Sequence, residues 1–179
     1  MKDISDKNFG LIIASILPGF ILLYGLSFSI PQISTWLLSN TPENTPKIAG
    51  FLYTSLASLA LGMTTSAFRW LLIDHVMHLI GVKSPNIDFS KLSDRDKYSA
   101  FLGLVENHYR YYQYYSNTLV SILISSISYI IVKQELPQYY FVVLVIAILI
   151  TLFFASRDAL RKYYNRTKAI LNEKQIITL

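Results

Sequence analysis

Apolar residues gather in four long stretches along the chain. The stretches cover about residues 9–30, 48–72, 115–132 and 138–156, and few charged side chains interrupt them. A helix of about 20 apolar residues crosses the roughly 30 Å hydrocarbon core of a bilayer. We therefore predict an all-α integral membrane protein with four transmembrane helices, in which residues 1–179 form a single membrane domain.

Helical patterns continue beyond the second, third and fourth stretches. The periodicity of the second stretch runs on to Gly81, a predicted helix C-cap, and Ser93 is the predicted N-cap of the next helix. Nothing interrupts a helix between Ser93 and about Lys133, and its first half repeats apolar residues every three or four positions. Residues 73–114 and the tail 157–179 are thus expected to form a small helical bundle outside the membrane.

Lysine and arginine are distributed unevenly along the chain. Of the sixteen, two precede the first stretch, six lie from Arg69 to Arg110 and six follow the fourth stretch, while the two other connecting segments hold one each. Cytoplasmic segments of membrane proteins carry the excess of basic residues, so both termini and residues 73–114 are predicted to be cytoplasmic. We expect a multi-pass protein of the bacterial inner membrane, with the lipid bilayer as its partner.

The composition supports this assignment. Hydrophobic residues make up 53% of the chain and charged residues 15%, whereas roughly a quarter of the residues in a soluble domain are charged. There is no cysteine. These figures exclude an ordinary soluble enzyme, a disordered tail and a disulfide-stapled secreted domain. Topology and anionic lipid explain the net charge of +5, so nucleic acid is not expected as a partner.

Small residues recur at every fourth position of the second stretch. This spacing aligns them on one helix face and allows close approach of another backbone. Packing within the protomer and an interface between copies both explain such a stripe. We expect a homo-oligomer, because the stripe and the amphipathic cytoplasmic helix both need packing partners. The stripe consists of Thr54, Ser58, Gly62 and Ser66.

The third stretch carries a polar face. Asn117, Ser121, Ser125 and Ser128 lie on nearly one side of the predicted helix. Such a face lines a narrow aqueous path in a channel, or it forms hydrogen bonds between helices. Both interpretations stay open at the level of the sequence.

Pro18 and Gly19 lie in the middle of the first stretch. A proline inside a helix removes one hydrogen bond and predicts a kink or break, which would be either a gating hinge or a static feature. No ionisable residue occupies the centre of any predicted span, and Arg69 lies near the cytoplasmic end of the second. This argues against a proton- or ion-coupled transporter, which needs such a group near the midplane.

Ionisable residues gather at the predicted cytoplasmic border. We expect a polar network there, with Arg69 paired to Asp74 and Arg110 paired to Glu106. The histidines offer two other interpretations: a metal site with carboxylates, and the Arg-x5-His spacing that resembles HEPN ribonucleases. Neither matches a full motif, so we expect no catalytic residue, metal or cofactor. The cluster consists of Arg69, Asp74, His75, His78, Glu106, His108 and Arg110.

Five tyrosines and one arginine fall within Tyr109–Tyr115, just before the third predicted span. Aromatic residues with arginine stack on bases in proteins that bind single-stranded nucleic acid. Tyrosines at the end of a membrane span also form an interfacial belt, with the ring in the apolar layer and the hydroxyl in water. The belt is the simpler explanation, and we predict it here.

Three segments resemble a group of small, uncharacterised bacterial four-helix membrane proteins. They are Leu17–Phe20, Phe51–Met63 and Val105–Tyr115. The resemblance covers most of the chain and implies a prokaryotic membrane protein, with no activity to carry over. In size and layout the chain is also similar to small membrane components of bacterial antiphage systems, which is an analogy of architecture.

These observations lead to two main hypotheses on function. The first is a homo-oligomeric inner-membrane channel or pore-forming effector, gated through the cytoplasmic helical bundle and lined by the polar face of the third span. The alternative is a non-conducting membrane scaffold or sensor that recruits a cytosolic effector protein, as in an antiphage defence system. A membrane enzyme is not expected.

Overall fold

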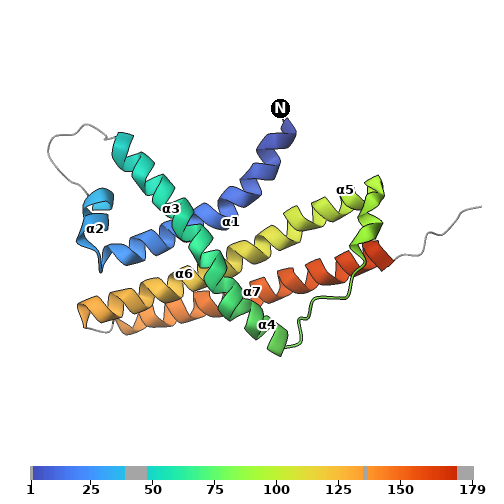
Figure 1. Ribbon diagram of the computed structural model, residues 1–179. Helices are drawn as coiled ribbons and strands as arrows, with labels where there is room; N and C mark the ends of the chain where they lie inside the picture. The colour runs from blue at the N-terminus through green and yellow to red at the C-terminus, as the bar shows by residue number, and fades with distance from the viewer. Residues whose placement is uncertain (1, 39–47, 135–136, 173–179) are drawn as a thin grey trace, which may run out of the picture.

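The computed structural model describes residues 2–38, 48–134 and 137–172, and all regular structure in these ranges is helical (Figure 1). It forms five continuous rods and one short 3₁₀ turn, so the predicted all-α class is confirmed. The elements are α1 (Lys2–Ser27), α2 (Pro31–Leu38), α3 (Ile48–Arg69), η1 (Trp70–Asp74), α4 (His75–Leu79), η2 (Phe89–Ser93), α5 (Arg95–Leu104), η3 (Val105–Tyr109), α6 (Arg110–Lys133) and α7 (Tyr139–Asn172).

Three of the rods are long and apolar enough to cross a membrane. They comprise Gly50–Leu79, Arg95–Lys133 and Tyr139–Leu171, and within the described part of α1 a shorter apolar helix covers Ile13–Ser27. The second of these rods extends well beyond the predicted third span, as the uninterrupted pattern up to Lys133 indicated. By the length and hydropathy of its helices, the chain is a multi-pass membrane protein.

α1 lies against both α3 and α6, and α3 crosses these two helices at a steep angle (Figure 1). α6 and α7 run antiparallel, side by side (Figure 1). α6 ends in the left-handed conformation of Gln134, whose backbone N–H donates to the carbonyl of Ile130. The last two long helices are thus antiparallel neighbours.

Glycines let α1 and α3 touch at their backbones. A Cβ atom added to Gly62 would lie 1.9 Å from the carbonyl oxygen of Ser15, and one added to Gly19 would lie 1.8 Å from that of Ser58. α1 stays helical through Pro18, so the chain does not break there. The role of Pro18 and Gly19 as a hinge stays a prediction, and both residues are buried at this crossing.

The loop between α4 and α5 has the predicted helix cap at its start and a different one at its end. Gly81 has a φ of +87°, and Val82 N–H donates to the Met77 carbonyl, which is the helix-ending geometry predicted for a glycine here. The predicted N-cap Ser93 is wrong. Asp94 caps α5 instead, because its carboxylate accepts the N–H groups of Asp96 and Lys97 while Ser93 ends the 3₁₀ turn η2.

An apolar core joins α4, α6 and α7 near Leu160, just after the predicted fourth span (138–156). Met77 of α4, Tyr112 of α6 and Leu160 of α7 are each at most 2% exposed within it. Tyr112 is therefore a core residue and not part of the predicted tyrosine belt. For the exposed Tyr111 the belt stays a prediction. Beyond this core, α5 and η3 pack on the last part of α7, so the helical extensions do associate as expected.

Candidate functional site

Four polar residues of α6 point toward the neighbouring helices rather than away from the protein. We call the set Asn117, Ser121, Ser125 and Ser128, with Ser58 and Ser66 of α3, the polar seam. Most of these side chains are buried, with Asn117 and Ser58 each 1% exposed and Ser121 fully buried. The predicted polar face of the third span therefore meets α1 and α3 inside the chain.

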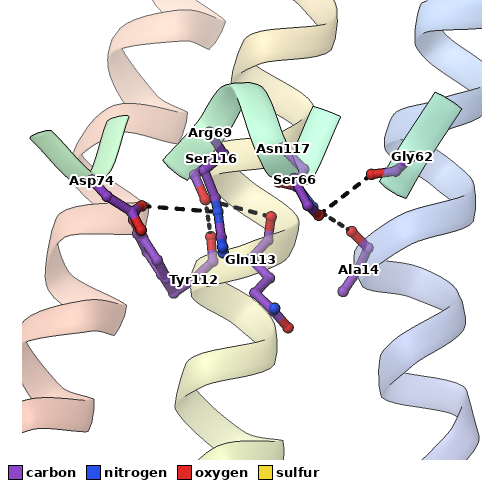
Figure 2. Close-up of polar contacts among 9 residues, drawn as sticks. All are labelled: Ala14, Gly62, Ser66, Arg69, Asp74, Tyr112, Gln113, Ser116 and Asn117. Atoms are coloured by element: carbon purple, nitrogen blue, oxygen red, sulfur yellow. Dashed lines mark hydrogen bonds and ion pairs between the residues drawn. The ribbon is translucent and has the colours of Figure 1, made fainter. Parts of the chain in front are cut away.

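Asn117 joins three helices at the centre of the seam. Its amide nitrogen donates to the carbonyl oxygen of Ala14 in α1 at 2.9 Å and to the hydroxyl of Ser66 in α3 at 3.0 Å (Figure 2). Ser66 in turn donates to the carbonyl of Gly62 at 3.4 Å. One side chain thus ties the small-residue stripe of α3 to both α1 and α6.

Serine side chains also join α6 to the α1 region toward the C-terminal end of α6. The hydroxyl of Ser125 donates to the carbonyl oxygen of Ile21 at 3.1 Å, and the hydroxyls of Ser128 and Ser29 are 2.5 Å apart. Ser125 also packs against Gly25, where an added Cβ would collide with it. The seam is therefore closely packed along α1.

The small-residue stripe of α3 packs against other helices of the same chain, which is one of the two explanations given for it above. Ser58 and Gly62 touch α1, and Ser66 touches α6, whereas Thr54 is only partly buried. An interface between copies through the same helix stays a prediction.

Several buried polar atoms of this region lack a hydrogen-bond partner among the described residues. They are Ser58 Oγ, Thr118 Oγ1, Ser121 Oγ and the amide oxygen of Asn117. Leaving such an atom unsatisfied costs about 1–3 kcal/mol. The seam is therefore closely packed, but several of its buried polar atoms have no hydrogen-bond partner among the described residues.

At the end that carries Asn117 the seam meets a charged cluster. Arg69, only 6% exposed, places its Nε 3.8 Å from an Asp74 carboxylate oxygen, which confirms the predicted pair. The hydroxyl of Tyr112 donates to the same carboxylate, and the Arg69 guanidinium lies 5.2 Å from the centre of the Tyr112 ring (Figure 2). Burial, reinforced by the hydrogen bond to Asp74, raises the pKa of Tyr112, so the phenol stays protonated.

The π turn η1 explains how Arg69 and Asp74 meet. A π turn has more residues per turn than an α-helix, so positions five apart fall on the same face. In an α-helix the same two residues would point in different directions. Tyr112 was missed as a site residue, although its place in the apolar repeat of residues 98–112 marked it for burial.

A second polar group lies on η3 and the start of α6. Arg110 pairs with Glu106 at 3.8 Å as predicted, and it also donates to the side chain of Gln113. His108 lies 2.7 Å from a guanidinium nitrogen of Arg166 on α7. Sequence reasoning missed Arg166, because the pairing joins residues 58 positions apart.

The three histidines do not form a metal site within the described ranges. His75 and His78 are exposed on α4, and no set of three histidine, aspartate or glutamate side chains among the described residues can hold an ion. His108 has its contact with Arg166 instead. The Arg69 side chain, the other half of the HEPN-like spacing, contacts Asp74 and Tyr112.

The contact of His108 with Arg166 makes the packing of η3 on α7 sensitive to pH. A guanidinium only donates, so the imidazole nitrogen that faces it must be the neutral acceptor. Burial first, and then the charges of Arg166 and Lys162, lower the pKa of His108 below its usual 6.5, while Asp158 opposes them. The folded protein thus binds this proton more weakly than the unfolded chain, and stability is lost as pH falls below about 6.5.

We expect the Tm of the wild-type protein to fall more between about pH 7.5 and 5.5 than that of His108→Gln. The glutamine oxygen accepts from Arg166 at every pH and does not titrate. The measurement is thermal unfolding of the purified protein in a neutral detergent, with the exposed His78→Gln as the control that follows the wild type. Equal losses of Tm in wild type and His108→Gln would contradict the assignment.

No protein-family model, curated protein or solved structure matches the chain. The resemblance of three segments to small bacterial membrane proteins therefore stays an expectation. The helices themselves establish the class: an all-helical membrane protein with three long apolar helices and a shorter fourth one.

Proposed function

We propose that the protein is a homo-oligomeric channel or pore-forming effector of the bacterial inner membrane, closed in the described conformation and gated through its cytoplasmic helices. The observation that carries this proposal is the polar seam. Its α6 residues follow one another from Asn117 to Ser128, and the Arg69–Asp74 pair lies beyond its cytoplasmic end. A continuous polar face of this kind provides the lining that water and ions need to cross an apolar layer.

The unpaired atoms of the seam support opening by a movement of α1. Native proteins pair most of their buried polar groups, so a cluster of unpaired ones has a free-energy cost in the closed arrangement. Moving α1 away from α6 would hydrate Ser121 and Thr118 and recover part of that cost. The contacts of Asn117 and Ser125 with α1 would be the ones broken.

The proposed topology has four spans, with α1 as the first and both termini in the cytoplasm. The distribution of lysine and arginine supports it, since fourteen of the sixteen fall on one side. The exposed apolar faces support a homo-oligomer: only 6% of the most apolar α7 window is buried within one chain. Lipid or a second copy covers these faces in a membrane.

Ion flux through liposomes that contain the purified protein tests the proposal. We expect wild-type protein to release a trapped ion under at least one activating condition, and Ser121→Val to reduce that flux by about tenfold, because a hydroxyl of the lining is lost. Thr151→Val is the matched control. Thr151 is exposed on α7 and donates only to the carbonyl of Ala147, so its loss leaves the flux unchanged.

A wild-type protein that is oligomeric by cross-linking and carries no flux would contradict the channel and favour the alternative function. That alternative is a membrane scaffold or sensor subunit that recruits a cytosolic effector, as in an antiphage defence system. The close backbone contacts at Gly19 and Gly62 favour it, because they make the packed spans a rigid anchor. The α5 and α7 extensions would then present the recruiting surface.

A further inference from the structure

A small pocket lies where the loop after α4 meets the part of α7 beyond the predicted fourth span. Its volume is about 280 Å³. Gly81 and Lys83 line it from the loop, and Arg157, Arg161 and Asn165 line it from α7. It is separate from the polar seam, none of whose residues lines it.

Three cationic side chains converge on this pocket from two distant segments. Arg157 and Arg161 are four residues apart, so they share one face of α7, and Lys83 approaches from the loop. No carboxylate lines the pocket, and none among the described residues forms an ion pair with these three side chains. The nearby Asp158 is engaged by Lys162 at 2.6 Å.

One guanidinium nitrogen of an arginine that lines the pocket lacks a hydrogen-bond partner among the described residues. The Nε of Arg157 is shielded from solvent, and no described residue accepts a hydrogen bond from it. Like charges brought together, with a buried donor left unpaired, are unfavourable without a counter-charge. An anion in the pocket would supply both the charge and the acceptor.

We propose that this pocket binds a phosphoryl group. A phosphate monoester carries a charge of about −1.5 to −2 and three strong acceptor oxygens, which matches several cations better than a single carboxylate does. Arginine forks hold phosphate oxygens in pairs, and lysine contributes a point charge. The side-chain amide of Asn165 adds a neutral donor to the same wall.

From the position of the pocket, the phosphoryl group has two potential sources. Arg157 follows directly after the predicted span 138–156, and under the proposed topology it lies at the level of the inner-leaflet headgroups. The phosphoryl group then belongs either to an anionic lipid or to a soluble phosphate compound. The inference goes beyond the proposed function, because binding here does not require that the protein conduct ions.

Thermal unfolding of the full chain in a neutral detergent tests the proposal. One arm adds inorganic phosphate against sodium chloride of equal ionic strength, and the other adds phosphatidic acid, a lipid with a phosphate monoester, against phosphatidylcholine. We expect a saturable rise in Tm in one arm, with the apparent Kd weakened on the order of tenfold in Arg161→Gln and in Lys83→Gln. Both side chains are exposed, so these variants keep the fold.

Lys168→Gln removes one positive charge from an exposed position of α7 outside the pocket and serves as the matched control. A response to phosphate that the two pocket variants weaken supports the proposal and identifies a soluble ligand. The same pattern with phosphatidic acid alone supports it and identifies a lipid. No rise in Tm in either arm overturns it, as does a rise that Lys168→Gln weakens as much as the pocket variants do.

Discussion

Replacing Gly62 with leucine should lower the free energy of unfolding by about 3 kcal/mol or more. The first side-chain carbon alone would lie 1.9 Å from the Ser15 carbonyl oxygen, which belongs to the backbone of α1 and has no rotamer to escape into. The two helices must therefore separate. That separation also pulls Ala14 away from Asn117 and weakens the hydrogen bond that ties α1 to α6.

Gly103→Leu is the matched control for this experiment. An added Cβ at Gly103 in α5 meets nothing within 4 Å, and leucine favours a helix over glycine, so stability should stay level or rise by about 0.5 kcal/mol. Both variants are unfolded in detergent micelles by added dodecyl sulfate, and helix content is followed by circular dichroism. Similar losses at the two positions would show that the α1–α3 crossing is not closely packed.

Replacing Asp74 with alanine should cost about 3 kcal/mol of stability. Arg69 is only 6% exposed, and the loss of Asp74 leaves its buried guanidinium without an anion. The hydroxyl of Tyr112 loses its acceptor in the same step. Removing one partner of a buried pair costs more than the pair contributes, because the remaining charge stays desolvated.

Two further variants test whether the cost comes from the unpaired charge of Arg69. Asp158→Ala breaks the exposed ion pair with Lys162 and should cost less than about 0.5 kcal/mol. Adding Arg69→Met to Asp74→Ala should recover part of the loss, because the unpaired cation is then gone. The same unfolding titration measures all three proteins. An Asp74→Ala protein as stable as Asp158→Ala would mean that Arg69 finds water or another acceptor.

The membrane class and several local features were predictable because they depend on neighbouring residues. Gly81 ends α4 as predicted, since its positive φ is a local preference of glycine. Ser93 was not the N-cap, because two polar residues compete there and the carboxylate of Asp94 reaches two N–H groups. The pair Glu106–Arg110 was predictable because residues four apart share one face of an α-helix. The pair Arg69–Asp74 was predicted from the closeness of the two residues in the chain, but its five-residue spacing meets on one face only in the π turn.

The partners of the polar seam were not predictable in the same way. Helical spacing showed that Asn117 and Ser125 share a face, but not that this face meets the backbone of α1 about 100 residues earlier. The π turn η1 was also missed, because no residue pattern in Trp70–Asp74 distinguishes it from an α-helix. It forms within the rod whose Ile73 and Met77 pack into the core with α6 and α7.

By itself, then, the sequence determined that this is a helical membrane protein, where its long apolar helices lie, and in which segments the basic residues gather. Hydropathy, capping and charge bias act over a few residues, so a single chain reveals them. Only the tertiary structure decided that the polar face of α6 is closed by α1 and that Lys83 joins Arg157 and Arg161. Those contacts depend on which helix faces meet, and that is set by packing between segments far apart in the chain.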